Sequence, residues 1–139
     1  MKPPAQAMER LRRIVGPKGW ATDAATLNPY LEDWRRLHQG KAAILLRPKT
    51  TDEVRRIVRC AFEYAIPIVP QGGNTGLVGG GTPDDSGEQI LLSLERLKGL
   101  RDIDTLNYSL CVNAGTTLAE VQETALQNNR FFLSLIHIS

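Results

Sequence analysis

The sequence has 139 residues, of which 42% are hydrophobic and 23% are charged, which suits one small globular domain or part of a larger one. The net charge of +2 is too small to indicate a nucleic-acid partner, which would require clustered basic residues with stacking aromatic side chains. No stretch approaches the roughly 20 apolar residues of a membrane span, and no secretory signal is evident, so we expect a soluble, cytoplasmic protein.

Residues 1–41 are predicted to form an N-terminal helix and a covering segment. The helix is predicted over residues 5–15, and Gly16-Pro17 ends it, because glycine accepts a left-handed cap and proline cannot continue a helix. Its apolar residues recur at helical spacing: Met8, Leu11, Ile14 and Val15. Residues 17–41 show no clear period, and we expect a short helix near residues 29–37.

A strand, a helix and a second strand are predicted next. Residues 42–47 are an apolar run closed by Pro48, which is typical of a buried strand. Thr50 can accept a hydrogen bond from the N–H three residues on, and Glu53 can reach back to the N-cap amide, so a helix begins here. Its apolar face is expected to consist of Val54, Ile57, Val58, Ala61 and Ala65. A strand from residue 66 to residue 69 completes a β-α-β unit, which implies a parallel pair with a right-handed crossover.

Three more strands, a helix and a strand are predicted in the rest of the chain. The strands cover residues 89–94, 100–104 and 109–113. Thr117 and Glu120 repeat the capping-box pattern, and Asn128-Asn129 ends the helix that follows. Three residues of this helix are expected to face the core: Leu118, Val121 and Ala125. With a last strand over residues 131–138, the order predicts an α+β fold with an α/β-like start.

The two cysteines, Cys60 and Cys111, show no metal-binding spacing. Both are predicted to be small buried residues in a reducing compartment, although the sequence alone leaves a disulfide between them open.

The most informative stretch is the glycine loop, PQGGNTGLVGGG, at residues 70–81. Half of its residues are glycine, which lets a ligand approach the backbone without a Cβ in the way. Successive backbone N–H groups in such a turn form a concave anion-binding nest. Charge-assisted hydrogen bonds contribute about 1.5–3 kcal/mol each, so three or four could hold a pyrophosphate without a lysine. The Thr75 hydroxyl could add another donor.

Other interpretations of this loop are less consistent with its position. A flexible lid without a ligand is the simplest alternative, but the loop follows an apolar strand, where ligands of α/β folds bind. The dinucleotide fingerprint GxGxxG is absent, and no helix directly follows the glycines. The spacing from Gly76 to Gly81 fits a Walker motif, but Thr82-Pro83 stands where Lys-Ser/Thr is needed, which disfavours NTP hydrolysis.

Four motifs occur in order along the chain. They are RPKTTDEV at 47–54, PQGGNTGLVGGG at 70–81, ILLSLERL at 90–97 and VNAGTTLAEV at 112–121. Together they resemble the FAD-binding domain of the p-cresol methylhydroxylase and vanillyl-alcohol oxidase type, with most similarity to the D-lactate, glycolate and D-2-hydroxyglutarate dehydrogenase branch. The similarity extends from about Tyr30 to about Leu135, so residues 42–135 are expected to be a partial FAD-binding domain.

This resemblance implies a cofactor, a reaction and a set of binding residues. FAD would accept hydride from the α-carbon of a small-molecule 2-hydroxy acid, which becomes a 2-oxo acid. The loop from Pro70 to Gly76 would wrap the FAD pyrophosphate, Val78 and Gly79 would line the cofactor, and Ala114-Gly115 would lie close to it. The implied cofactor-binding residues are Pro70, Gln71, Gly72, Gly73, Asn74, Thr75, Gly76, Val78, Gly79, Ala114 and Gly115.

The end of the sequence departs from this family. After Phe131-Phe132 the family continues into a second glycine-rich segment and a substrate-binding cap domain, whereas residues 136–139 form an anomalous tail. We therefore expect a truncated chain whose catalytic residues lie outside it, and we assign none here. His38 is expected to have a surface role, and Asp84, Asp85 and Glu88 are expected to form a solvated turn, not a metal site.

Two alternatives to the flavoenzyme interpretation stay open at this point. One is a self-contained, non-catalytic phosphate- or nucleotide-binding module. The other is an inactive fragment, which would expose the strand edge at residues 109–113 and tend to aggregate.

Overall fold

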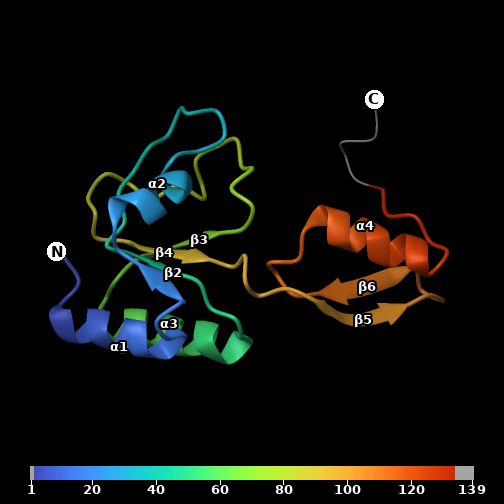
Figure 1. Ribbon diagram of the computed structural model, residues 1–139, viewed down its shortest axis with the longest axis horizontal. Helices are drawn as coiled ribbons and strands as arrows, with labels where there is room; N and C mark the ends of the chain where they lie inside the picture. Colours follow the sequence, from blue (N-terminus) through green and yellow to red (C-terminus); the bar gives the residue numbers. More distant parts are fainter. Residues whose placement is uncertain (1, 134–139) are drawn as a thin grey trace.

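A computed structural model describes residues 2–133 of the chain (Figure 1). The helices are α1 (Ala5–Val15), α2 (Ala24–Leu31), α3 (Thr51–Glu63) and α4 (Leu118–Gln127). The strands are β1 (Trp20–Ala21), β2 (Ile44–Leu46), β3 (Ile68–Gln71), β4 (Ile90–Ser93), β5 (Leu100–Asp104) and β6 (Ser109–Val112). Within the described residues no helix is long and apolar enough to cross a bilayer.

The larger sheet has the strand order β1-β2-β4-β3. Strands β2, β4 and β3 run parallel, and β1 is antiparallel to β2. The predicted β-α-β unit is present as β2-α3-β3, but its two strands are not direct neighbours. Ile44 of β2 and Ile68 of β3 both face Ile90 of β4, so the later strand lies between them. Three parallel strands therefore end at one edge of this sheet, and the glycine loop begins there.

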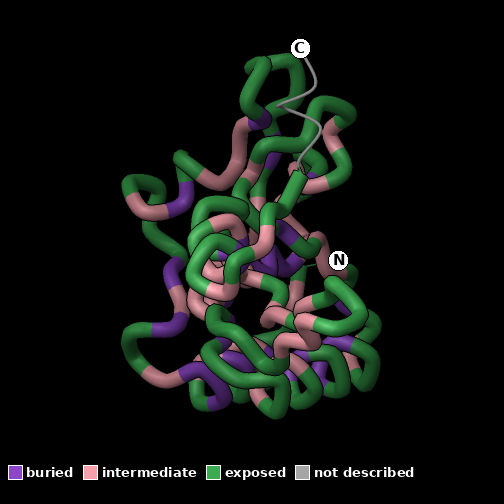
Figure 2. Tube along the Cα trace, turned by 90° about the vertical axis from the view of Figure 1, so that its right-hand side faces the viewer, coloured by how far each residue is buried: buried purple, intermediate pink, exposed green. Residues whose placement is uncertain are grey.

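The sheet is covered on both faces, which explains its continuous apolar runs. Helices α1 and α3 lie together on one face and α2 lies on the other (Figure 1). Within β2, Ile44 and Leu46 pack under α1 and α3, whereas Leu45 packs toward α2. Buried residues lie on the strands and at intervals along the helices, and Figure 2 shows them as short segments distributed along the trace, some of them near its centre.

Two helices begin at the caps that the sequence predicts. The Thr50 hydroxyl accepts from the Glu53 N–H at 3.1 Å, and Thr117 forms a complete capping box with Glu120. One detail of the first cap differs. The Glu53 carboxylate accepts from the N–H of Lys49 at 2.6 Å, one residue before the N-cap, instead of from the N-cap amide itself.

The chain from Leu100 onward forms a second, smaller unit of β5, β6 and α4 (Figure 1). Strands β5 and β6 pair antiparallel, as predicted, with an irregularity between Leu100 and Asp102. Helix α4 buries Val121 and Ala125 against this pair.

Several predictions for individual segments were wrong. The short helix expected near 29–37 lies earlier, at α2, because the Asp23 carboxylate caps it by accepting from the Thr26 N–H. Cys111 is exposed, because β6 belongs to the small two-stranded sheet, whereas Cys60 is buried as predicted. Three residues expected to face the core are exposed: Val58, Ala65 and Leu118. Ala65 lies beyond the end of α3 at Glu63 and has a left-handed backbone, with φ of 52°. Residues 131–133 are not in a strand, and the rest of the expected last strand lies outside the described residues.

Candidate functional site

The glycine loop encloses a cavity of about 290 Å³ at the carboxyl end of β3. The lining consists of Pro70, Gln71, Gly72, Gly73, Asn74, Thr75, Gly76, Gly79, Gly81 and Thr82. Eight of the residues that the resemblance implies are among them, and Gly81 and Thr82 are additional. Val78 belongs to the same loop but is not in the lining, and its side chain is 89% exposed.

The backbone N–H groups of the loop are available to a ligand. Within the described part of the chain, no hydrogen bond from the N–H groups of residues 72–81 to a protein acceptor is found. A Cβ built on Gly72 or Gly76 would meet nothing within 4 Å, so the backbone there faces open space. Unpaired N–H groups around a concave surface are the donors that an oxyanion requires.

The buried side chain of Gln71 holds the two ends of the loop together. Its Nε2 donates to the carbonyl of Gly81 at 2.8 Å and to the carbonyl of Tyr30 at 2.9 Å. It also lies 3.2 Å from Oδ1 of Asn74. Gln71 is 3% exposed, and its Oε1 has no hydrogen-bond partner among the described residues. Its amide donors are thus occupied within the protein, where they fix the shape of the loop.

Replacement of Gln71 by methionine should therefore destabilise the fold, because methionine has a similar length but no donor. Two carbonyls would lose their partner in a partly buried position, at a cost of about 2–3 kcal/mol in the free energy of unfolding. Urea unfolding measures this difference. The matched control is Gln127→Met on the exposed surface of α4, which should change stability by less than about 0.5 kcal/mol. Equal stability of the two variants would contradict the role of Gln71.

Asn74 fastens the loop to the end of α2. Its backbone is left-handed, with φ of 55°, a conformation that asparagine tolerates better than most residues. Its Nδ2 donates to the carbonyl of Glu32 at 2.8 Å. The side chain of Asn74 is thus partly committed to the protein, whereas its backbone N–H is free.

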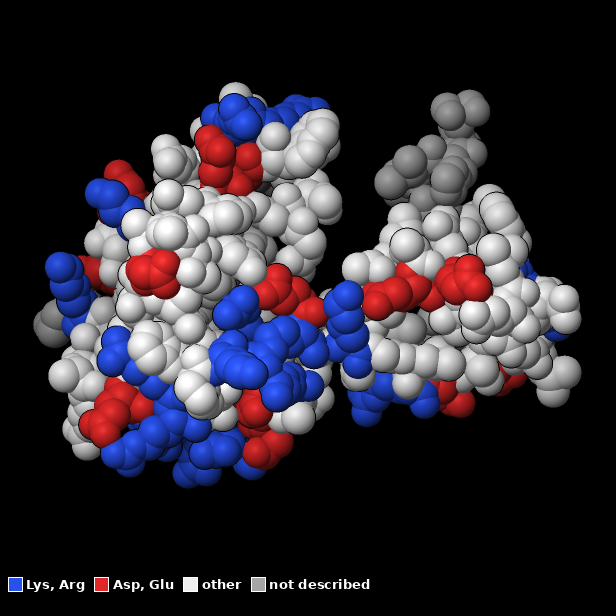
Figure 3. Space-filling model, in the orientation of Figure 1, with Lys and Arg blue, Asp and Glu red and all other residues white. Residues whose placement is uncertain are grey.

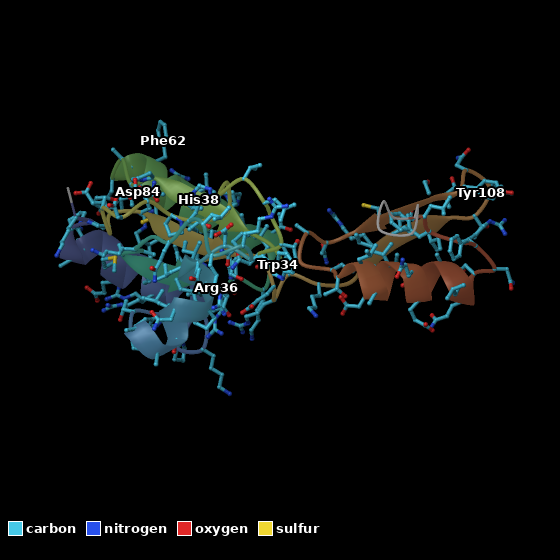
Figure 4. The ribbon with its side chains drawn as sticks, turned by 90° about the horizontal axis from the view of Figure 1, so that it is seen from above. Trp34, Arg36, His38, Phe62, Asp84 and Tyr108 are labelled. Atoms are coloured by element: carbon cyan, nitrogen blue, oxygen red, sulfur yellow. The ribbon has the colours of Figure 1, made fainter. Side chains whose placement is uncertain are left out.

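Residues 32–40 form a compact loop, closed by the bridge between Glu32 and Gln39, that packs beside the glycine loop. Asp33 organises this 32–40 loop, because its Oδ1 accepts from the N–H groups of Leu37 at 2.7 Å and His38 at 2.8 Å. The His38 ring lies against Gly79, where an added Cβ would be 2.9 Å from it. Figure 4 shows His38 and Asp84 in the same region of the larger unit.

The hydrogen bond from the His38 N–H, followed by that of Leu37, holds the pKa of Asp33 below its usual range, against the opposing effect of burial. A lowered carboxyl pKa in the folded state stabilises the fold above the unfolded pKa of about 3.9, and this contribution is lost as pH falls through the folded pKa. We therefore expect Asp33→Asn to unfold at lower urea concentration than the wild type at pH 6. The difference in urea midpoint between the variant and the wild type should be smaller at pH 3 than at pH 6. An equal difference at both pH values would contradict this role of the Asp33 carboxylate.

Gly115 packs against the segment from Leu94 to Leu97, which is hydrogen-bonded to the start of the glycine loop, and Ala114 and Gly115 are not in the lining of the cavity. The Gly115 N–H donates to the carbonyl of Leu97 at 2.8 Å, and a Cβ on Gly115 would be 1.8 Å from the carbonyl oxygen of Leu94. The Leu94 N–H in turn donates to the Gln71 carbonyl at 2.9 Å. Gly115 is therefore linked to the start of the glycine loop through Leu94.

The other polar residues considered from the sequence do not join this site as a cluster. Asp84 accepts from the N–H of Ser86 at 3.0 Å in an exposed turn, which agrees with the predicted solvated turn. Within residues 2–133 no group of three or more His, Cys, Asp and Glu side chains is placed to hold a metal ion. No local sequence signal indicates the role of Asp33, because its partners lie in a turn without a motif.

Residues 42–136 match the family model of the FAD binding domain. A D-2-hydroxyglutarate dehydrogenase of Bos taurus is 37% identical over 113 residues, which are 81% of this chain and 20% of that protein. One from Xanthomonas citri pv. viticola is 36% identical over 115 residues, 83% of this chain and 24% of that protein. The structure of p-cresol methylhydroxylase with substrate bound superposes with a TM-score of 0.76 at 23% identity, over 89% of this chain and 24% of that chain.

Proposed function

The chain belongs to the FAD-binding domain family, and on this premise we propose that it is the FAD-binding portion of a dehydrogenase that oxidises a 2-hydroxy acid to a 2-oxo acid. The names of the bovine and Xanthomonas relatives support D-2-hydroxyglutarate or a similar D-2-hydroxy acid as the substrate class. The chain spans a fifth to a quarter of the length of these relatives, so the activity belongs to the whole protein.

The glycine loop fits the pyrophosphate of FAD. The single observation that carries this assignment is the run of backbone N–H groups from Gly72 to Gly81 without a protein acceptor, beside an open cavity. The lining contains no charged residue, so the phosphates would be held by hydrogen bonds from neutral donors. Thr75 and Thr82 add hydroxyl donors at the same surface.

The residues of this chain bind and orient, whereas FAD supplies the redox chemistry by which hydride leaves the α-carbon of the 2-hydroxy acid. Backbone donors of Gly72, Gly73 and Gly76 would contact the phosphates. Gln71 and Asn74 would act one layer behind, because their amides hold the loop in shape. Ala114 and Gly115 would approach the cofactor from the neighbouring turn. Val78, with its exposed side chain, would contact parts of FAD beyond the pyrophosphate.

The proposed location is cytoplasmic. Its support is that Cys60 and Cys111 are both free thiols, as a reducing compartment would keep them. The name of the bovine relative places that protein in mitochondria.

FAD titration, followed by flavin fluorescence, tests the proposal. The chain should quench FAD at micromolar concentrations, and ADP should compete, since it carries the same pyrophosphate. Riboflavin, which has no phosphate, should bind at least about tenfold more weakly, because each charge-assisted hydrogen bond contributes about 1.5–3 kcal/mol. Equal binding of riboflavin and FAD would contradict the pyrophosphate assignment, and failure of both to bind would contradict the proposed function of this chain.

A further inference from the structure

A second cavity, of about 520 Å³, lies between α1 and α3, on the face of the sheet that does not carry α2. Its lining consists of Arg10, Arg13, Ile14, Arg55, Arg56 and Arg59. Figure 3 shows Lys and Arg side chains gathered along this lower edge of the larger unit. Among the residues that the structure describes, all the polar side chains that line this groove are arginines, and no carboxylate lines it.

The packing of α1 against α3 brings these arginines together. Helix α1 buries Leu11 and helix α3 buries Ile57 and Cys60 in the same core cluster, so the two helices pack side by side. The arginines at the positions between these apolar residues then meet along the outer rim. Ile14 is nearly buried and lies at the base of the groove.

The carboxylates that pair with these arginines lie beside the groove, and three of them, Glu9, Asp52 and Glu63, face five arginines, so two positive charges remain in excess. Arg13 pairs with Glu9, and Arg55 pairs with Asp52. Glu63 serves two arginines, because it pairs with Arg10 and also lies 3.2 Å from Nε of Arg59. Arg56 forms no ion pair with any residue that the structure describes. Since each guanidinium has five N–H donors, pairing with one carboxylate leaves donors free for a ligand.

The partner carboxylates offset only part of the repulsion between the arginines. Arg10 and Arg13 are three positions apart on α1, and Arg55 and Arg59 are four positions apart on α3, spacings at which like charges destabilise a helix. Along each helix these pairs span about 4.5–6 Å. The positive charge is therefore concentrated in a short groove, which suits one compact polyanion better than an extended chain of separated charges.

We propose that the groove between α1 and α3 binds a compact polyanion, a phosphate ester or a polycarboxylate, at a site separate from the glycine loop. Guanidinium groups recognise both classes through paired N–H donors. Binding relieves the repulsion between the arginines and stabilises the folded chain, as any ligand of the native state does.

Two probes, inorganic tripolyphosphate and citrate, test this site in the FAD-free chain at constant ionic strength. Isothermal titration calorimetry measures the affinity, and the side-chain N–H resonances of the arginines in ¹⁵N-labelled protein report where the probe binds. The variant Arg13→Gln/Arg56→Gln should lose at least about tenfold in affinity, because charge-assisted hydrogen bonds to two guanidiniums are removed. The control Lys41→Gln/Arg101→Gln removes the same charge from exposed positions elsewhere and should change it by less than about twofold.

The results of these titrations distinguish the two ligand classes, and they distinguish the arginine groove from the glycine loop as the binding site. Preference for tripolyphosphate assigns a phosphate ester, and preference for citrate assigns a polycarboxylate. Equal losses in both double variants would overturn the proposal, since binding would then follow net charge alone. Probe-induced changes confined to the amides of residues 72–81 would also overturn it. Both results are independent of FAD binding, which is measured with FAD itself.

Discussion

Replacement of Gly73 by aspartate is expected to weaken FAD binding by at least about a hundredfold. Gly73 lines the cavity of the glycine loop, and its N–H is one of the free donors. A carboxylate about 4 Å from a phosphate charge costs on the order of 4 kcal/mol at the effective dielectric constant typical near a protein surface. The change should therefore act on the ligand and leave the fold largely intact.

The variant Gly73→Asn distinguishes the effect of the negative charge from the effect of side-chain size, because asparagine has nearly the size of aspartate but no charge. A Cβ on Gly73 would have one neighbour at 4.0 Å, the methyl group of Thr75, so both side chains fit. Gly73→Asn should keep FAD affinity within a few-fold of the wild type, whereas Gly73→Asp should lose it. Flavin fluorescence titration and thermal unfolding of both variants check this. Comparable affinities for the two variants would show that no phosphate lies beside Gly73.

The elements that the sequence predicted well depend on local signals. Apolar residues at helical spacing and the terminating Gly16 predicted α1 to the residue. The hydroxyls of Thr50 and Thr117 marked the starts of α3 and α4, because a cap is a contact between residues three apart. The glycine loop could likewise be predicted, since its density of glycines follows directly after an apolar strand.

The features that the sequence did not predict depend on contacts between distant residues. Strand β4 lies between β2 and β3, and no local pattern indicates which parallel strands become neighbours. Asp33 is buried beside His38 in a turn without a motif, and the His38 ring reaches Gly79 only in the folded chain. The arginine groove was similarly missed, because Arg10 and Arg13 alone resemble a solvated helix face.

The structure also suggests different roles for the side chains and the backbone of the predicted site residues. Gln71 and Asn74 were predicted to bind the cofactor, but their amides donate to carbonyls of the protein. In the proposed site, recognition would therefore depend on backbone donors, and the polar side chains would keep those donors in place. This division explains why glycines suit the loop so well: a ligand held by N–H groups must come close to the main chain.

Replacement of Gly115 by alanine tests whether the turn that contains Gly115 helps to form the proposed cofactor site. A Cβ there would lie 1.8 Å from the carbonyl oxygen of Leu94 and 2.9 Å from that of Leu97, and both are main-chain atoms that no side-chain rotation can move. The backbone must shift, at a cost of about 3 kcal/mol in the free energy of unfolding. Because the Leu94 N–H donates to the Gln71 carbonyl, the shift should also reach the glycine loop and weaken FAD binding.

The control for this variant is Gly80→Ala, where an added Cβ meets nothing within 4 Å and the backbone φ is not positive. Urea unfolding should show a stability loss of less than about 0.5 kcal/mol for Gly80→Ala, as at other surface positions, against the much larger loss for Gly115→Ala. FAD titration of Gly115→Ala and of the wild type then shows whether the strain at Gly115 reaches the glycine loop. Gly80→Ala controls only for stability, because Gly80 belongs to that loop. If Gly115→Ala loses stability but binds FAD like the wild type, the turn at Leu94–Leu97 supports the fold alone, and Ala114 and Gly115 do not help to form the cofactor site.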